Sequence, residues 1–391
     1  MNKLKVLIIG GTGCISSALV NECISTGIAV TTINRGRRKD QNSDKVTLIK
    51  ADKNDLNRIK SALAEETFDA VIDFLCYTKE DLKTSFNFYS NYADQYFFIS
   101  SCAVYDLRSV KIGLEDGPKS DERWNYSVNK WDAEELLRKL AKEQNKSYTI
   151  VRPSVTYGDT RIPYGITPPY GKHGTLIQRI LHGKPIIRWN GGENVCNMMR
   201  VEDFSRAFVK LIANKDAYNT EFNICSEKYY SYNQVIQIIE RHYDKKATII
   251  DISVDEYAQL LPERKGELIV DRGADRISSL KKFKQLFPDF QEKYDLEKGL
   301  NKTLSAYEAQ NWMNGISWEF DGECDGIIKK LIKAKRIRSP KLNTQFIDYL
   351  SNSSKKDRVL YLMGVYKNTI PVRAIKYFKP ILKDIYLKIH G

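Results

Sequence analysis

The chain has 391 residues, of which 42% are hydrophobic and 28% charged, and its formal net charge is +13. Length and composition fit a water-soluble α/β protein of one large domain with additions, or of two to three ordinary domains. No stretch approaches the roughly 20 apolar residues that span a bilayer, and the seven scattered cysteines contain no CxxC pair. We therefore expect a cytoplasmic protein with no metal site and no disulfide framework.

Short apolar runs alternate with helical patterns along the first 225 residues. We expect strands at residues 5–9, 29–33, 46–49, 70–74, 95–99 and 148–151, and one more at 222–224. Helical patterns lie between them at 16–26, 53–65, 79–92 and 127–145. This alternation predicts a doubly wound parallel sheet covered by helices on both faces, which binds ligands beyond the carboxyl ends of its strands. A Gly- and Pro-rich loop at 158–174 is expected to be functional, as long ordered loops often are.

A glycine-rich turn, GGTGCIS at 10–16, joins the first strand to the first helix. Gly10 permits the tight turn, and Gly13 lacks a side chain, so that backbone N–H groups can approach a pyrophosphate. The helix start adds free N–H donors and a positive dipole end. Ser16 stands where the third glycine is usual, and a purely structural turn is the alternative. The cofactor residues predicted here are Gly10, Gly13, Cys14 and Ile15.

The second strand leads into Asn34-Arg35-Gly36-Arg37-Arg38, where an NAD site usually has an acidic residue for the ribose 2′-hydroxyl. A carboxylate repels a 2′-phosphate, whereas a guanidinium binds it. We therefore favour NADP(H) as the cofactor over NAD(H), the alternative being a basic surface loop. The further cofactor residues predicted are Asn34, Arg35, Arg38, Asp52 after the third strand and Leu75 after the fourth.

Tyr126 and Lys130 are four residues apart in a helical pattern, which places them on one face. A nearby ammonium lowers the pKa of a phenol, which is ordinarily near 10, and makes Tyr126 a usable acid/base for carbinol–carbonyl interconversion. Both side chains are also expected to contact the cofactor. Ser101 follows a strand, where its hydroxyl can hydrogen-bond the substrate oxygen. The alternative is a packing tyrosine beside a solvated lysine.

In this order the motifs resemble those of the extended short-chain dehydrogenase/reductase family, in its branch of NAD(P)-dependent nucleotide-sugar epimerases, dehydratases and reductases. GGTGCIS is similar to the family's GGTGFIG, SSCAVY at 100–105 to its SSxxVYG, and YSVNK at 126–130 to its YxxxK. VRPSVTYG at 151–158 resembles its LRPxxVYG. The resemblance covers about residues 1–310.

Two departures from the family bear on the reaction and the substrate. Cys102 and Ala103 stand where its 4,6-dehydratases carry an Asp–Glu pair, so elimination of water is not expected. Seven residues before Asp203, where epimerases of this branch often present an arginine to the substrate diphosphate, this chain has Cys196. Arg188 or Arg200 could replace that arginine. The predicted substrate-binding residues are Ser101, Cys102, Arg188 and Arg200.

The resemblance implies an NAD(P)-dependent epimerase or reductase of a nucleotide-linked sugar, in cell-surface polysaccharide synthesis and as a homodimer. We expect a Rossmann-type domain from residues 1–165 and 195–225, and a smaller substrate-binding part from 166–194 and 226–312. A non-catalytic regulatory or RNA-binding protein with the same fold is the alternative.

Residues 326–391 carry sixteen Lys/Arg against three Asp/Glu, so the whole net charge of +13 lies in the last sixth of the chain. Apolar and basic residues alternate there at near-helical spacing, which predicts a basic, helical extension over 313–391. Such an extension could pack on the enzyme or on a protein partner, or lie on the anionic inner face of a membrane. Nucleic acid is the partner least favoured.

Overall fold

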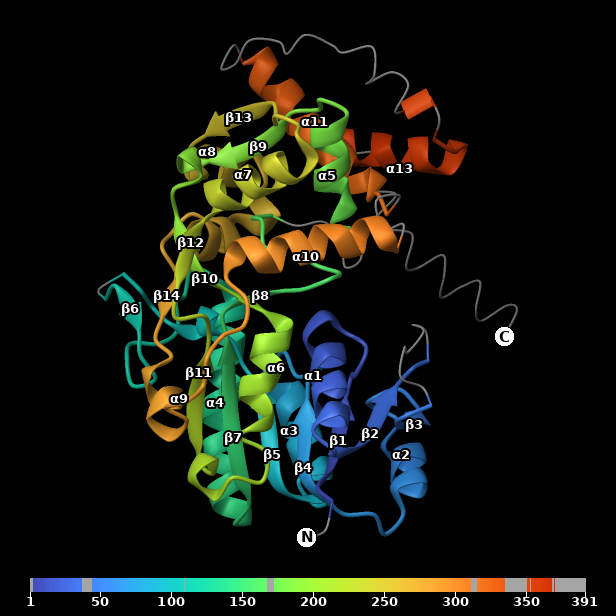
Figure 1. The fold of residues 1–391 in the computed structure, drawn as a ribbon, viewed down its shortest axis with the longest axis vertical. Helices are drawn as coiled ribbons and strands as arrows, with labels where there is room; N and C mark the ends of the chain where they lie inside the picture. The colour runs from blue at the N-terminus through green and yellow to red at the C-terminus, as the bar shows by residue number, and fades with distance from the viewer. Residues whose placement is uncertain are drawn as a thin grey trace.

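The computed structural model of the chain describes residues 3–36, 44–108, 110–166, 172–310, 315–334, 350–351, 353–367 and 369. Figure 1 shows two parts, one built on a large open sheet and the other mostly helical. The N-terminal half of the chain supplies most of the sheet, and the segments after residue 225 supply most of the helical part.

The large sheet has seven parallel strands in the order β11-β7-β5-β4-β1-β2-β3. Its strands are β1 (Lys5–Ile9), β2 (Ala29–Asn34), β3 (Thr47–Lys50), β4 (Phe68–Asp73), β5 (Ala93–Ile99), β7 (Ser147–Pro153) and β11 (Thr220–Ile224). The chain runs outward from β1 to β2 and β3 on one side, and from β4 to β11 on the other. The switch of direction therefore lies between β1 and β4, which confirms the predicted doubly wound sheet.

Alternate side chains of β1 divide the interior into two layers. Val6 and Ile8 are fully buried against one group of helices, and Leu7 and Ile9 against the other. The first group is α1 (Cys14–Ser25) and α6 (Val201–Val209). The second is α2 (Leu56–Leu63), α3 (Lys79–Tyr89) and α4 (Asn125–Gln144). Because both faces are covered, the strand reads as an uninterrupted apolar run.

The structure also has three small sheets, of which the first two pack around a separate apolar core. Their strands are β8 (Val155–Tyr157) with β10 (Val195–Arg200) and β12 (Tyr229–Ser231), β9 (Ile186–Trp189) with β13 (Ile249–Ile252), and β6 (Ile112–Gly113) with β14 (Ile277–Ser278). The helices around this core are α5 (Gly174–Leu181), α7 (Tyr232–Tyr243), α8 (Val254–Leu260) and α10 (Leu296–Ala309), whereas α9 (Lys281–Leu286) packs beside β11 on the large sheet.

The described residues of the C-terminal extension are helical, as expected. They form α11 (Trp318–Lys333) and α13 (Lys355–Val365). The two helices approach so closely that a Cβ at Gly322 would lie 2.0 Å from the carbonyl oxygen of Tyr361. A Cβ at Gly364 would likewise lie 2.0 Å from the carbonyl oxygen of Glu319. Only glycine permits this contact between the two backbones.

Four buried charges attach α11 to the rest of the protein. Arg179 of α5 lies 2.6 Å from Asp321 and 2.8 Å from Asp325, and Lys184 lies 2.9 Å from Asp325. Lys184 also pairs with Asp321. Tyr361 of α13 adds a 2.7 Å hydrogen bond to Asp325. The start of the extension is therefore packed on the second part of the molecule through two fully neutralised pairs, and not held in solvent.

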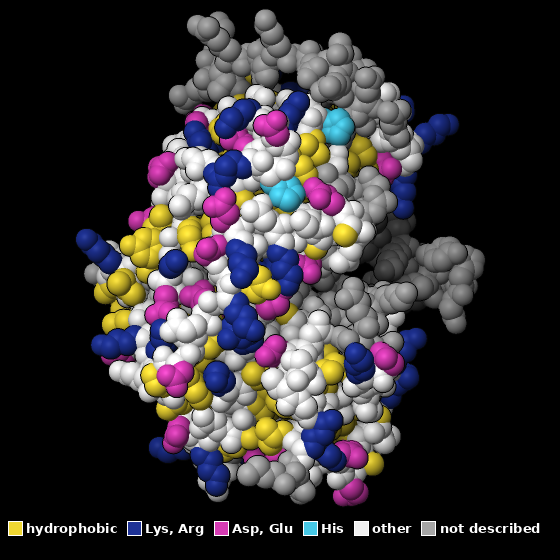
Figure 2. All heavy atoms as spheres, viewed as in Figure 1, with side chains coloured by type: hydrophobic (Ala, Val, Ile, Leu, Met, Phe, Trp, Pro, Cys, Tyr) yellow, Lys and Arg dark blue, Asp and Glu magenta, His cyan; other side chains and the backbone are white. Residues whose placement is uncertain are grey.

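The outer surface mixes charges of both signs. Figure 2 shows Lys and Arg side chains spread among Asp and Glu over one face of the molecule. Within the described part of the chain, no helix is long and apolar enough to cross a membrane.

Candidate active site

A cleft of about 1140 Å³ opens at the carboxyl ends of β1, β2, β4 and β5. It lies at the switch between β1 and β4, where doubly wound sheets bind their ligands. The structure brings together here every predicted catalytic and cofactor residue that it describes; Arg38 lies outside the described residues. These cleft residues are Gly10, Gly13, Cys14, Ile15, Asn34, Arg35, Asp52, Leu75, Ser101, Cys102, Tyr126 and Lys130.

The glycine-rich turn has the geometry of a phosphate cradle. Gly10 has φ +88°, and a Cβ there would lie 2.8 Å from Cγ of Leu75. Ser16, which replaces the third glycine, donates to the carbonyl oxygen of Gly10 at 2.7 Å and accepts from the N–H of Gly13 at 2.8 Å. The hydroxyl thus fixes the turn from within. Because α1 begins at Cys14, the first N–H groups of the helix have no carbonyl partner within it.

The opposite end of the cleft suits an adenosine ribose. Asn34 Oδ1 accepts from the N–H of Gly36 at 2.8 Å, while its buried Nδ2 has no partner among the described residues. The guanidinium of Arg35 is about half exposed and lies 4.0 Å from Asp52. A glycine cradle at one end and an unsatisfied amide donor at the other fit a dinucleotide cofactor.

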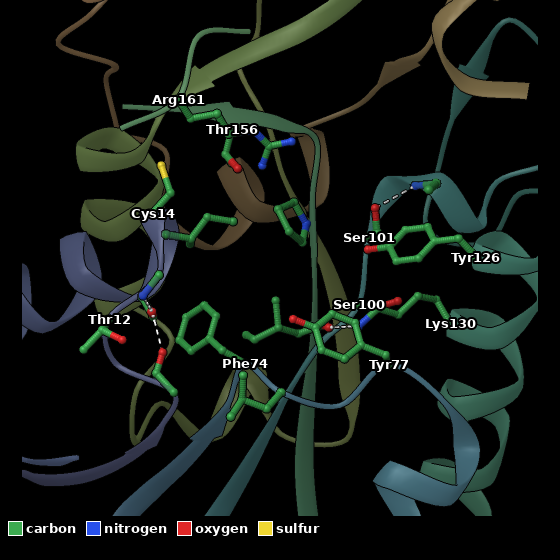
Figure 3. Close-up of a pocket in the computed structure, with 18 of the residues that line it drawn as sticks. Thr12, Cys14, Phe74, Tyr77, Ser100, Ser101, Tyr126, Lys130, Thr156 and Arg161 are labelled. Carbon is green, nitrogen blue, oxygen red and sulfur yellow. Dashed lines mark hydrogen bonds between the residues drawn. The ribbon is translucent and has the colours of Figure 1, made fainter. Parts of the chain in front are cut away.

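Ser101, Tyr126 and Lys130 meet beside this cradle. Tyr126 and Lys130 project from α4, and Ser101 precedes the short 3₁₀ turn η1 (Cys102–Val104). Figure 3 shows Ser101 and Tyr126 adjacent to one another at the wall of the cavity. Lys130 is buried; its ammonium donates to the carbonyl oxygens of Cys76 at 2.6 Å and Ile99 at 2.9 Å. It lies 6.0 Å from the centre of the Tyr126 ring.

Burial dominates the protonation of this pair. Desolvation raises the pKa of Tyr126 to about 12, and a hydrogen bond with Ser101 and the charge of Arg161 oppose the rise only in part. Burial lowers the pKa of Lys130 to about 8. The predicted lowering of the Tyr126 pKa is therefore not found, because desolvation of the phenolate outweighs the hydrogen bond with Ser101 and the charge of Arg161.

A buried ion pair lies behind the predicted catalytic residues. Glu134, one turn after Lys130, accepts from the hydroxyl of Ser100 at 2.6 Å and from Nε of Arg152 at 2.9 Å. Burial would raise the pKa of Glu134, but Arg152 lowers it, so the carboxylate remains charged. These contacts tie α4 to the ends of β5 and β7, and so fix the position of the neighbouring Ser101 and Lys130.

Cys102 lines the cleft, as predicted, but it offers no acid/base group. Its thiol donates to the carbonyl oxygen of Arg152 at 3.2 Å, and burial raises its pKa to about 12. Ala103 beside it has no polar side chain. The cleft therefore lacks a carboxylate at the two positions where dehydratases would need one.

The two arginines predicted for the substrate do not line the cleft. Arg188 is engaged on the outside of the second part, with Asp251 at 2.6 Å and Asn233 at 2.8 Å. Arg200 is buried, and its guanidinium donates to the carbonyl oxygen of Gly299 at 2.7 Å. Since these hydrogen bonds occupy both guanidinium groups outside the cleft lining, the structure gives no support to a substrate role for either arginine.

Other charged residues, which sequence reasoning missed, line the cleft in their place. They are Arg161, Glu267, Asp271, Arg272 and Arg276. Arg161 belongs to the Gly- and Pro-rich loop that was expected to be functional, so a signal for it existed. Arg272 is the last residue of a π-helical turn, η5 (Glu267–Arg272). No hydrophobic periodicity in the sequence predicts such a turn.

The sequence matches the family model "NAD dependent epimerase/dehydratase family" over residues 6–225. A relative, the chloroplast stem-loop binding protein of 41 kDa b from Arabidopsis thaliana, is 28% identical over 245 residues, which are 59% of this chain. The chain spans only about 60% of the length of that relative.

Solved structures share the fold. An epimerase from Methanothermobacter thermautotrophicus superposes with a TM-score of 0.66 at 17% identity, covering 80% of this chain and 94% of that one. A UDP-glucose 4-epimerase from Thermotoga maritima, solved with UDP-glucose, gives 0.63 at 20% identity, with 79% and 100% covered. A UDP-glucuronic acid 4-epimerase from Bacillus cereus, solved with UDP-glucuronic acid and NAD, gives 0.62 at 18% identity, with 78% and 100% covered.

Proposed function

Because the chain belongs to the NAD dependent epimerase/dehydratase family, we propose that it is an NAD(P)-dependent epimerase or reductase of a nucleotide-linked sugar. The observation that carries this proposal is that Ser101, Tyr126 and Lys130 converge in one cleft with the glycine cradle. Two fold neighbours solved with UDP-sugars support the substrate class. Synthesis of cell-surface polysaccharides, which consumes such sugars, is the setting we propose.

The cofactor would lie along the cleft from Asn34 to Lys130. The turn from Gly10 to Ile15 would hold its pyrophosphate, and Asn34 with Arg35 its adenosine ribose. We favour NADP(H), because residue 34 is an amide and not a carboxylate and because Arg35 is free to turn toward a 2′-phosphate. When bound, the nicotinamide supplies a hydride donor or acceptor and, in its oxidised form, a positive charge.

The protein's own residues would transfer the proton. Tyr126 would exchange a proton between its phenol oxygen and the oxygen of the reacting sugar carbon, while Ser101 hydrogen-bonds that same oxygen. The phenol oxygen can donate a proton to a keto oxygen or accept one from a carbinol, so the same residue could serve a reductase or an epimerase. The absence of a carboxylate at Cys102 and Ala103 argues against dehydration.

One assay separates the two reactions. A reductase consumes NADPH in a 1:1 ratio with a 4-keto nucleotide sugar, whereas an epimerase converts its substrate with no net change in nicotinamide absorbance. Tyr126→Phe should reduce either activity about 10²- to 10⁴-fold. Tyr229→Phe is the matched control, because Tyr229 is exposed and lies outside the cleft. Turnover retained by Tyr126→Phe would contradict the assignment.

RNA binding is the second candidate function. The stem-loop binding relative and the basic residues 326–391 favour it. An RNA mobility shift that weakens steeply with salt, from a chain that binds no dinucleotide, would support this candidate over the enzyme. Dinucleotide binding that RNA leaves unchanged would support the enzyme.

A further inference from the structure

Arg161 is an uncompensated cation in the cleft. Among the described residues, no acidic side chain pairs with Arg161, and its guanidinium makes no side-chain hydrogen bond. The neighbouring cations differ: Arg272 lies 3.3 Å from Asp271, and Arg276 donates to the carbonyl oxygen of Cys102 at 2.8 Å. Burial lowers the pKa of Arg161, as desolvation of an unneutralised cation does.

The backbone around Arg161 forms a rigid turn. Its N–H donates to the carbonyl oxygen of Gly158 at 3.0 Å, and its own carbonyl accepts from the N–H of Gly158 at 3.2 Å. A Cβ at Gly158 would lie 2.6 Å from Cγ2 of Val201 and 3.5 Å from Sγ of Cys14. The turn is therefore packed between the starts of α1 and α6, beside the phosphate cradle.

Arg200 stabilises this turn through contacts with Asp159 and Thr303. It forms an ion pair with Asp159, the residue after Gly158, and donates to Oγ1 of Thr303 at 2.7 Å. Thr303 in turn donates to the carbonyl oxygen of Gly158 at 3.3 Å. Arg200, which is buried, thus fixes the backbone turn from which the Arg161 side chain extends into the cleft.

We infer that Arg161 binds an oxyanion of the substrate, a phosphate or a carboxylate, and that Arg200 and Asp159 position it. This inference rests on the proposed function and names the residue that would take the place of the arginine absent at Cys196. Figure 3 shows the Arg161 side chain directed into the cavity that Ser101 and Tyr126 also face. A desolvated guanidinium without a carboxylate is suited to a charge-assisted pair with a bound anion.

The test is calorimetric titration of the full chain saturated with NAD⁺, so that the dinucleotide cradle is filled. The probes are UDP, UDP-glucose, UDP-glucuronate and inorganic pyrophosphate. Arg161→Gln should weaken binding at least tenfold, since loss of a charged hydrogen bond costs about 1.5–3 kcal/mol. Arg188→Gln is the matched control, because Arg188 is ion-paired outside the cleft. Binding of NAD⁺ itself should not change in either variant.

The pattern of losses identifies the anion. If UDP and pyrophosphate are weakened equally with the sugars, Arg161 binds phosphate; if only UDP-glucuronate is weakened, it binds a ring carboxylate. Dissociation constants that stay within twofold for every probe would overturn the inference while leaving the proposed function standing. A chain that binds pyrophosphate through Arg161 but no nucleotide would support the inference and contradict the proposed function. A chain that binds none of the four would overturn the inference.

Two variants of Asp159 test whether this residue positions Arg161. Asp159→Asn removes one charge of the ion pair with Arg200 and should weaken the same probe that Arg161→Gln weakens, with NAD⁺ affinity unchanged. Asp159→Glu, which keeps the carboxylate, should restore most of the lost affinity. Equal loss for all ligands, NAD⁺ included, would show a general structural defect and overturn the positioning role.

Discussion

The ammonium of Lys130 donates a 2.9 Å hydrogen bond to the carbonyl oxygen of Ile99, the last residue of β5. This bond joins the helix that carries Tyr126 to the strand that ends two residues before Ser101. Lys130 therefore helps to set the distance between Tyr126, the proposed acid/base, and the hydroxyl of Ser101, which would bind the same substrate oxygen. The packing of α4 also contributes to this distance.

Lys130→Met should abolish turnover and alter the pH dependence of stability. An ordinary lysine has a pKa near 10.5, and burial lowers that of Lys130 to about 8. Between these values the unfolded chain binds the proton that the folded protein has lost, so Lys130 makes wild-type stability rise with pH in this window. The wild type should gain up to about 3 kcal/mol over the variant between pH 8 and 10.5, measured by urea unfolding. Lys139→Met, an exposed position on the same helix, should show no such gain.

Gly10→Ala should weaken dinucleotide binding and destabilise the fold. The substitution combines a positive φ with a Cβ placed 2.8 Å from Leu75. Gly27→Ala is a matched control, because Gly27 has φ +82° but open space around its Cβ position. We expect about 1–2 kcal/mol from backbone strain alone at Gly27 and a larger loss at Gly10, measured by denaturant unfolding. Equal losses would mean that the contact with Leu75 does not matter.

Arg35→Ala should change cofactor preference. Because its guanidinium is exposed and only 4.0 Å from Asp52, it can move to a 2′-phosphate without leaving a buried charge. We expect at least a tenfold weaker Kd for NADP⁺ and less than a twofold change for NAD⁺, both from fluorescence titration. A similar loss for both dinucleotides would contradict a phosphate-specific role.

Asp321→Asn should destabilise the protein strongly, because it leaves Lys184 and Arg179 sharing a single buried carboxylate, Asp325. Breaking one partner of a buried pair costs about 3–5 kcal/mol, which chemical denaturation would detect. Asp251→Asn removes a half-exposed partner of Arg188 and should cost about 1 kcal/mol or less. Comparable costs at the two sites would show that burial does not govern these pairs.

The sheet, and the convergence of Ser101, Tyr126 and Lys130 in one cleft, were predictable because local signals determine them. Short apolar runs marked the strands, and the glycine turn marked the start of α1. Ser101 follows β5, and Tyr126 and Lys130 lie in the first turns of α4, which starts at the edge of the sheet where the parallel strands end. Convergence in the cleft thus followed from element order, and needed no knowledge of distant contacts.

The substrate end was not predictable, because contacts distant in sequence decide it. Arg200 has the same side chain as Arg161, yet Gly299 and Thr303, about one hundred residues later, turn it inward. The prediction of a lowered pKa for Tyr126 was wrong for a related reason. Helical spacing shows which residues share a face of the helix, but it does not show how strongly the fold desolvates them. The residue type and the local sequence pattern reveal neither the contacts made by distant residues nor the degree of desolvation.

The charge cluster beneath α11 also constrains the order in which the protein can be assembled. Arg179 leaves the ribosome 142 residues before Asp321 and 146 residues before Asp325. Until those carboxylates emerge, burial of α5 would leave the positive charge of Arg179 with the carbonyl oxygen of Pro185 but no carboxylate to neutralise it. We therefore expect the second core to close only once α11 has been made.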